Sequence, residues 1–314
     1  MTMKNGAILL IGFNRPNFLK DRLREIIKLS QAGVDIYVSI DGPRQGNLVD
    51  ELAQKEIKSI LVEHSKINQI QIWFSQTNKG CDKHIFDSIS KVLSNKEYLV
   101  VVEDDVAITH KAAEQMLYKA SQVLTLGKLN PIIAMSGPFL RILPRHNMWR
   151  TSNYFSAWGF AVNKDFWELH LRTLPINDSN TVEELKSQSE TWGNTSLLKR
   201  KIWDERMARI NYDYLIQRTI FLHGINTIAP LFRISDNVGH GISGAAHTRF
   251  RTPWFLKFST FGRNDVFKNN PISSQKINSL LTWTDSQTWA GDGLLSVRGR
   301  NKGVRTHLRK LFTK

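Results

Sequence analysis

No apolar run in the 314 residues approaches the roughly 20 residues that a membrane-spanning helix requires. The chain has one cysteine, Cys81, so it cannot form an internal disulfide, and this is typical of a reducing compartment. The apolar part of the N-terminus is too short for a signal peptide and continues as a strand pattern. We therefore expect a cytoplasmic globular protein that is large enough to bury a substantial core.

The usual glycine-rich phosphate loops are also missing. The first predicted strand, residues 7–13, is followed by Asn14-Arg15-Pro16, and neither a Gly-x-Gly-x-x-Gly turn nor a Walker loop occurs there. A nucleotide bound by this chain would need another way to neutralise its phosphates. A divalent cation together with Arg or Lys side chains would do so.

Acidic residues are fewer than basic ones, at 28 against 43, and the formal net charge is +15. This excess suits nucleic acid, an anionic membrane or an anionic substrate as partner. It is strongest in residues 296–314, which hold seven basic residues and no acid. Apolar residues recur there at helical spacing: Val304, Leu308, Leu311 and Phe312. The segment is typical of a basic amphipathic helix on an anionic membrane surface, and a solvated tail is the alternative.

The first 126 residues alternate between strand and helix patterns. We expect strands at 7–13, 35–40, 69–74 and 98–102, and helices at 17–30, 50–63, 82–93 and 111–126. Strands separated by helices form a mostly parallel sheet flanked by helices, so the fold class is α/β. The loops after such strands gather at one edge of the sheet, where open α/β sheets bind ligands. This edge would bring together Asn14-Arg15, Asp41-Gly42, Asn78-Lys79-Gly80 and Glu103-Asp104-Asp105.

Three consecutive carboxylates, Glu103-Asp104-Asp105, end the fourth predicted strand. Because side chains alternate along a strand, Glu103 and Asp105 would share a face and Asp104 would point the other way. Neighbouring anions repel in a partly dry site, so the arrangement suits a divalent cation that carries a diphosphate. An acidic loop that caps the helix after Thr109 is the alternative.

Two further polar side chains follow the first two strands. Arg15 could grip a phosphate with its planar guanidinium, although Pro16 after it is also an ordinary helix start. Asp41 could accept hydrogen bonds from a ribose or a base, whereas Asp41-Gly42-Pro43 is also ordinary turn chemistry. Neither motif decides between its two interpretations by itself.

The second half of the chain reads as irregular and aromatic. Trp158-Gly159 could cover the apolar face of a sugar ring or belong to the core. Asp204, beside Trp203, could act as a base toward a hydroxyl, or form an ion pair on a helix surface. The glycine-rich segment 237–247 could wrap a ligand and use His240 or His247 on a metal or phosphate, or it could be a surface loop.

Basic and aromatic residues are mixed in the segment 249–268, which could suggest a nucleic-acid surface. No recognised nucleic-acid-binding motif accompanies them. A membrane-facing or acceptor-facing patch accounts for the same composition, so we expect no nucleic-acid partner.

Taken in order, these motifs resemble nucleotide-sugar glycosyltransferases of the GT-A fold. The resemblance is narrower to bacterial family-2-like sugar transferases and more remote to eukaryotic N-acetylglucosaminyltransferase I, and it covers about residues 5–250. The motifs that carry it are Phe13-Asn14-Arg15, Ser39–Gly42, Asn78-Lys79-Gly80, Glu103-Asp104-Asp105, Trp158-Gly159-Phe160, Trp203-Asp204 and Asn237–Gly241.

The resemblance implies a nucleoside diphosphate sugar, with Mn²⁺ or Mg²⁺ between its phosphates and the acidic triplet. Asp105 matches the residue that contacts the metal, with His247 near metal or phosphate. Asp204 matches the base that deprotonates an acceptor hydroxyl. The implied donor-binding residues are Arg15, Asp41, Lys79, Gly80, Glu103 and Asp104, and Trp158 and Gly159 would bind the acceptor. Glu103 stands where many relatives carry Asp, which changes its reach but keeps its charge.

The resulting expectation is a Rossmann-like half for the nucleotide sugar at 1–125, an acceptor-binding and catalytic half at 126–262, and a basic extension at 263–314. The enzyme would transfer a sugar, with UDP-sugars favoured, to a hydroxyl of a glycan or lipid-linked acceptor in bacterial surface polysaccharide synthesis, with inversion. The eukaryotic relatives carry an N-terminal membrane anchor and this chain shows none, so we expect it at the inner face of the cell membrane. The alternatives are a sugar-nucleotide nucleotidyltransferase and a non-catalytic basic protein that binds membrane or nucleic acid.

Overall fold

The computed structural model describes residues 5–65, 70–125, 132–134, 149–152, 155–172, 211–223, 225, 227–230 and 234–239. The predicted extension at 263–314 therefore lies outside the described residues, and so does much of the predicted acceptor half. No helix among the described residues is both long enough and apolar enough to cross a membrane.

The first 125 residues form alternating strands and helices, as predicted. They are β1 (Gly6–Gly12), α1 (Pro16–Ile26), η1 (Ile27–Ala32), β2 (Asp35–Ile40), α2 (Leu48–Ser65), β3 (Ile70–Phe74), α3 (Cys81–Leu93), β4 (Tyr98–Glu103), β5 (Val106–Ile108) and α4 (His110–Thr125). Each predicted strand and helix is present. The prediction missed β5 and the change from α1 to the 3₁₀ helix η1, which stops before Gly33 at a positive φ of 76°.

Short elements make up the described parts of the second half. They are β6 (Ile132–Ala134), β7 (Trp149–Ser152), β8 (Phe160–Asn163), α5 (Lys164–Phe166), the π-helix η2 (Trp167–Leu171), α8 (Tyr212–Leu222), β9 (Thr227–Pro230) and β10 (Ser235–Asn237). The sequence pattern of this half is irregular, and its described residues nevertheless form strands and helices. Strands of three or four residues are too short to show an alternating pattern in the sequence.

One eight-stranded sheet joins both halves, in the order β3-β2-β1-β4-β8-β6-β9-β7. Strands β3, β2, β1 and β4 are parallel neighbours, and β8 runs antiparallel to both β4 and β6. Because β9 is parallel to β6 and antiparallel to β7, six strands share one direction and β8 and β7 oppose them. The predicted α/β fold with a mostly parallel sheet and flanking helices is confirmed.

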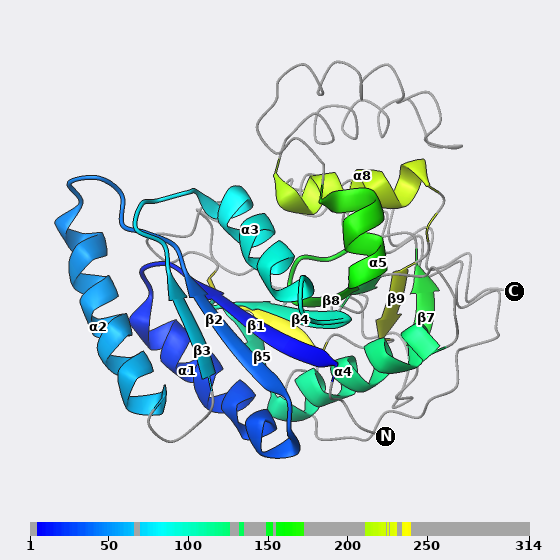
Figure 1. The fold of residues 1–314 in the computed structure, drawn as a ribbon, viewed down its shortest axis with the longest axis horizontal. Helices are drawn as coiled ribbons and strands as arrows, with labels where there is room; N and C mark the ends of the chain where they lie inside the picture. The colour runs from blue at the N-terminus through cyan, green and yellow to red at the C-terminus, as the bar shows by residue number, and fades with distance from the viewer. Residues whose placement is uncertain are drawn as a thin grey trace, which may run out of the picture.

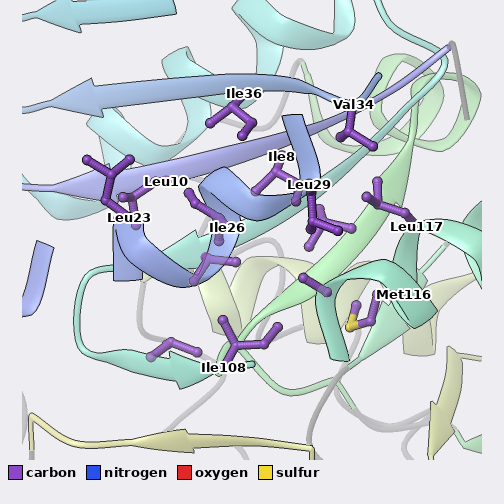
Figure 2. Packing of buried hydrophobic residues seen from close by; sticks show 14 of the residues in the cluster. Ile8, Leu10, Leu23, Ile26, Leu29, Val34, Ile36, Ile108, Met116 and Leu117 are labelled. Atoms are coloured by element: carbon purple, nitrogen blue, oxygen red, sulfur yellow. The ribbon is translucent and has the colours of Figure 1, made fainter. Parts of the chain in front are cut away.

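Helices cover both faces of the sheet (Figure 1). On one face, α1, α2 and α4 pack on the even-numbered residues of β1 and β4, and on the other, α3, η2 and α8 pack on the odd-numbered ones. Figure 2 shows Ile8 and Leu10 of β1 beside Leu23 and Ile26 of α1 in the first of these layers. Burial on both faces explains why β1 and β4 are almost continuously apolar up to their carboxyl ends.

The small two-stranded sheet pairs β5 with β10 in antiparallel register. Asn237 lies opposite Val106, which directly follows the acidic triplet. A segment more than 120 positions further along the chain is thereby fixed next to the end of β4.

Candidate functional site

The carboxyl ends of β1, β2 and β4 form one edge of the sheet, as the strand–helix alternation predicts. Backbone hydrogen bonds extend the strand ladder past the strand ends: the amide of Asp41 donates to Gly12 O at 3.0 Å and that of Asp104 to Ile11 O at 2.9 Å. The segments that carry Arg15, Asp41 and Asp104 are therefore neighbours. Gly42 lets the loop after β3 approach the end of β2 as well, because a Cβ at Gly42 would lie 2.3 Å from the carbonyl carbon of Thr77.

Arg15 holds the two aspartates of the acidic triplet. Its Nε donates to Asp104 Oδ2 at 3.2 Å and its Nη2 donates to Asp104 Oδ1, while its Nη1 donates to Asp105 Oδ2 at 2.9 Å. We call Glu103, Asp104 and Asp105 the carboxylate ledge. Strand β4 ends at Glu103 and the chain turns at the next two residues, so the strict alternation that we predicted stops there, and one guanidinium reaches both aspartates.

Burial sets the electrostatics of the ledge. The side chain of Asp104 is only 1% exposed, against 14% for Asp105 and 20% for Arg15. Burial raises the pKa of Asp104 to about 6, although Arg15 favours the carboxylate. Burial opposes the charged form of Arg15 as well, but the attraction of Asp104 and Asp105 outweighs it and the pKa of Arg15 is raised.

Glu103 faces the other layer and meets a residue that the sequence did not single out. Tyr212, the first residue of α8, donates its hydroxyl to Glu103 Oε1 at 2.5 Å. Its backbone amide donates to Asp82 Oδ1 at 2.7 Å. Burial and Asp105 raise the pKa of Glu103 to about 8, against the effect of the Tyr212 hydrogen bond. Tyr212 thus ties the second half of the chain to the ledge, and no local motif marks it.

Asp105 is also in contact with the segment after β10. The amide of Val238 donates to Asp105 O at 2.8 Å, and a Cβ at Gly239 would lie only 2.5 Å from Asp105 Oδ2. Only glycine allows the backbone to come this close to the carboxylate. The start of the glycine-rich segment 237–247 therefore lies against the ledge, and its predicted place near the donor stays a prediction. His247 itself and Asp204 lie outside the described residues.

The carboxylate of Asp41 organises the loop after β3. It accepts hydrogen bonds from the amides of Gly42, Lys79 and Gly80 at 2.9 to 3.2 Å and from Asn78 Nδ2 at 3.1 Å. Gly80 has a positive φ of 80° where α3 begins, a conformation that favours glycine. Asp41 and Gly80 thus set the position of the loop beside the ledge, and the predicted contact of Asp41 with a nucleoside stays a prediction.

A buried polar cluster supports Asp41 from below. His84 Nδ1 lies 3.7 Å from Asp41 Oδ1 and 3.4 Å from Ser75 Oγ, and its Nε2 lies 3.2 Å from Ser39 Oγ. Burial lowers the pKa of His84, although Asp41 favours the imidazolium. The neutral ring therefore packs next to Asp41 and does not form a charged pair with its carboxylate.

The remaining predicted site residues that the structure describes are Lys79, Trp158 and Gly159, and they lie at different places around the edge. The Lys79 ammonium pairs with Asp87 on α3 at 2.7 Å, so only its backbone faces Asp41. Trp158 packs partly against the first core layer, and its carbonyl accepts a hydrogen bond from Ser235. The β8 register pairs Phe160 with Val101, which brings Gly159, at a φ of 83°, and Trp158 to the edge where β4 ends.

Asp50 and Arg44 form a second ion pair beside the ledge, and the sequence did not reveal it. Arg44 donates its Nε and Nη2 to the buried Asp50 at 2.6 and 2.8 Å. Asn14, next to Arg15, donates to the same carboxylate at 2.7 Å. This pair fixes the start of α2 against the turn after β1.

The described residues contain no group of three or more Asp, Glu, His or Cys side chains that could hold a metal ion. Mg²⁺ and similar cations are usually bound through one or two carboxylates together with substrate phosphates. Asp105 has that character, because it is the more exposed aspartate of the ledge and adjoins Glu103. The residues present fit a cation that a diphosphate helps to bind.

No protein-family model and no curated protein matches the chain. Among solved structures, it is similar to a protein from Desulfovibrio desulfuricans G20 named as a candidate nucleotide-diphospho-sugar transferase, with 11% identity, a TM-score of 0.32, and coverage of 66% of this chain and 77% of that one. It is also similar to residues 1–349 of TarS from S. aureus, with 11% identity, a TM-score of 0.38, and coverage of 68% and 71%. Neither similarity is strong enough to assign a function. A functional proposal therefore rests on the carboxylate ledge.

Asp41→Asn is expected to destabilise the protein by about 1–3 kcal/mol, because an amide NH₂ would replace one acceptor oxygen among several N–H donors. Urea unfolding followed by circular dichroism measures the change. Asp87→Asn is the matched control, since Asp87 is 36% exposed and pairs with Lys79 and Lys83 at the surface. Equal stability of the two variants would contradict the role of Asp41 in the loop.

We expect the free energy of unfolding to fall in acid because of Asp50. The hydrogen bond from Arg44 lowers the pKa of Asp50 from its ordinary 3.8 to about 2. The stabilisation that this carboxylate provides is therefore complete at pH values above its pKa in the unfolded state. It is lost as the pH falls through its pKa in the folded state. The difference in unfolding free energy between the wild type and Asp50→Asn should shrink between pH 5 and about pH 2. A constant difference across that range would show that the ion pair does not act in this way.

Proposed function

We propose that this protein is a metal-dependent glycosyltransferase that moves a sugar from a nucleoside diphosphate sugar to a hydroxyl group. The observation that supports it is the carboxylate ledge at the carboxyl edge of the parallel strands, with a guanidinium bound across Asp104 and Asp105. Open α/β sheets bind ligands at this edge. A cation at Asp105 and the Arg15 guanidinium are the two positive groups that a diphosphate needs in a chain without a glycine-rich phosphate loop.

Mn²⁺ or Mg²⁺ would be held by Asp105, with Glu103 beside it and His247 as a candidate further ligand. When bound, the cation would stabilise the charge on the departing diphosphate, an effect worth several kcal/mol. Arg15 would bind the diphosphate from the side of β1. The nucleoside would bind beside the end of β2, against the loop that Asp41 holds at Lys79-Gly80.

The acceptor would approach from the side of β8. Trp158, which is half-buried, and Gly159 reach the edge of the sheet beside β4, where an aromatic face suits a sugar ring. In this proposal Asp204 takes the proton from the acceptor hydroxyl, whose oxygen attacks the anomeric carbon as the bond to the diphosphate breaks, with inversion. The acceptor is a glycan or lipid-linked sugar of a bacterial surface polysaccharide, with UDP-sugar as the favoured donor. The basic segment 296–314 would hold the enzyme at the anionic inner face of the membrane.

A panel of nucleotide sugars with Mn²⁺ tests the proposal directly. Slow hydrolysis of one sugar nucleotide to the free nucleoside diphosphate is expected, and it would also identify the donor. The rate should disappear in Asp105→Asn, whose circular dichroism should stay that of the wild type. Glu51→Gln, an exposed acid on α2, is the matched control and should keep the rate. Release of pyrophosphate instead would favour a nucleotidyltransferase, and no turnover at all would favour a binding protein.

Asp204→Asn should keep the affinity for the nucleotide sugar but slow transfer by on the order of 10²–10⁴-fold, because a positioned base contributes about that much. Isothermal titration with the donor and single-turnover transfer separate the two quantities. A large loss of donor affinity with unchanged transfer would give Asp204 a binding role instead.

A further inference from the structure

All three nitrogens of the Arg15 guanidinium donate to the carboxylate ledge, but their contacts are unequal. Two nitrogens form a fork on Asp104, which is 1% exposed and held by the backbone ladder. The third nitrogen, Nη1, makes one hydrogen bond to Asp105, which is 14% exposed. A bidentate contact to a buried carboxylate is much harder to break than a single contact at the rim. The contact with Asp105 is therefore the one that a ligand can displace.

Arg15 and a divalent cation require the same carboxylate. Oδ2 of Asp105 is bound by Nη1 at 2.9 Å, and the backbone at Gly239 closes in on the same oxygen. A cation on Asp105 would also stand close to a guanidinium whose charge cannot be removed near neutral pH. Without an anion between them, the two positive charges repel each other.

A diphosphate removes this conflict. Its oxygens can bind the cation and accept the hydrogen bond that Nη1 releases, while the fork on Asp104 keeps the guanidinium in place. Asp104, whose side chain is 1% exposed, then serves as the fixed anchor of Arg15.

We propose that Arg15 is an exchangeable counter-ion of the ledge. In the ligand-free protein it neutralises Asp105 and weakens cation binding, and when a nucleoside diphosphate binds, its Nη1 hydrogen bond passes from Asp105 to the diphosphate. The cation and the nucleotide therefore bind with positive cooperativity. This inference rests on the proposed function, since it needs both ligands at the same edge of the sheet.

Two measurements with opposite expected signs test the exchange. Arg15→Gln should bind Mn²⁺ alone about tenfold more tightly than the wild type, because a neighbouring positive charge is removed. The same variant should bind UDP in the presence of Mn²⁺ at least about tenfold more weakly, because a charge-assisted hydrogen bond to phosphate is lost. The electron paramagnetic resonance signal of free Mn²⁺ reports the first affinity, and isothermal titration reports the second. A purely structural role of Arg15 would weaken both.

The controls separate local competition from a general change of charge. Arg44→Gln removes one positive charge from the same edge, but Arg44 is 56% exposed and pairs with Asp50, so its Mn²⁺ affinity should stay within about twofold of the wild type, as expected for a charge that solvent screens. Asp105→Asn should abolish Mn²⁺ binding with either residue at position 15. A gain in Mn²⁺ affinity that survives in the Asp105→Asn background would overturn the proposal.

Arg15→Lys covers the case in which Arg15→Gln does not fold. A lysine keeps a positive charge for the buried Asp104 but lacks the planar fork that reaches both aspartates. It should therefore raise the Mn²⁺ affinity in the same direction by a smaller factor. Unchanged Mn²⁺ affinity in both folded variants would refute the exchange while leaving the proposed function intact. A wild type that binds neither Mn²⁺ nor UDP would refute both.

Discussion

The contact between Arg15 and Asp104 is the interaction on which the rest of the site depends. A carboxylate with 1% exposure at the end of a central strand is tolerated only with a well-placed positive partner. Arg15 supplies it with a two-nitrogen fork from the turn between β1 and α1. Because β1 and β4 are adjacent parallel strands, the fork also fixes how their two following loops meet.

The other contacts extend from this pair in both directions along the sheet. On one side, Asp41 collects the amides of the loop after β3, with the neutral His84 beneath it. On the other side, Glu103 accepts a hydrogen bond from the Tyr212 hydroxyl, and the backbone carbonyl of Asp105 accepts one from the Val238 amide. Segments from across the described chain are thus tied to one row of acids. A site with this much internal bonding is preorganised, which is the property that catalysis by charge stabilisation needs.

Much of the first half could be predicted because each of its strands and helices carries its own pattern. Strands β1, β2 and β4 are buried runs, and the helices between them have apolar residues at helical spacing. The neighbourhood of Arg15, Asp41 and the triplet then follows from the rule that parallel strands end at one edge. The second half could not be predicted in this way, because β6 to β9 have only three or four residues each and are defined by the neighbours they pair with.

The sequence by itself determined the fold class, the edge of the sheet and the identity of the acids on it, since these depend on local patterns of apolar and charged residues. Only the tertiary structure decided what each polar group does. In it, the carboxylate of Asp41 accepts hydrogen bonds from a loop, the ammonium of Lys79 pairs with Asp87, and the hydroxyl of Tyr212 donates to Glu103. Some of these partners lie more than a hundred positions apart in the sequence. The order of residues in the chain does not show which of several possible donors bonds to a buried carboxylate. Packing of the two layers on the sheet makes that choice.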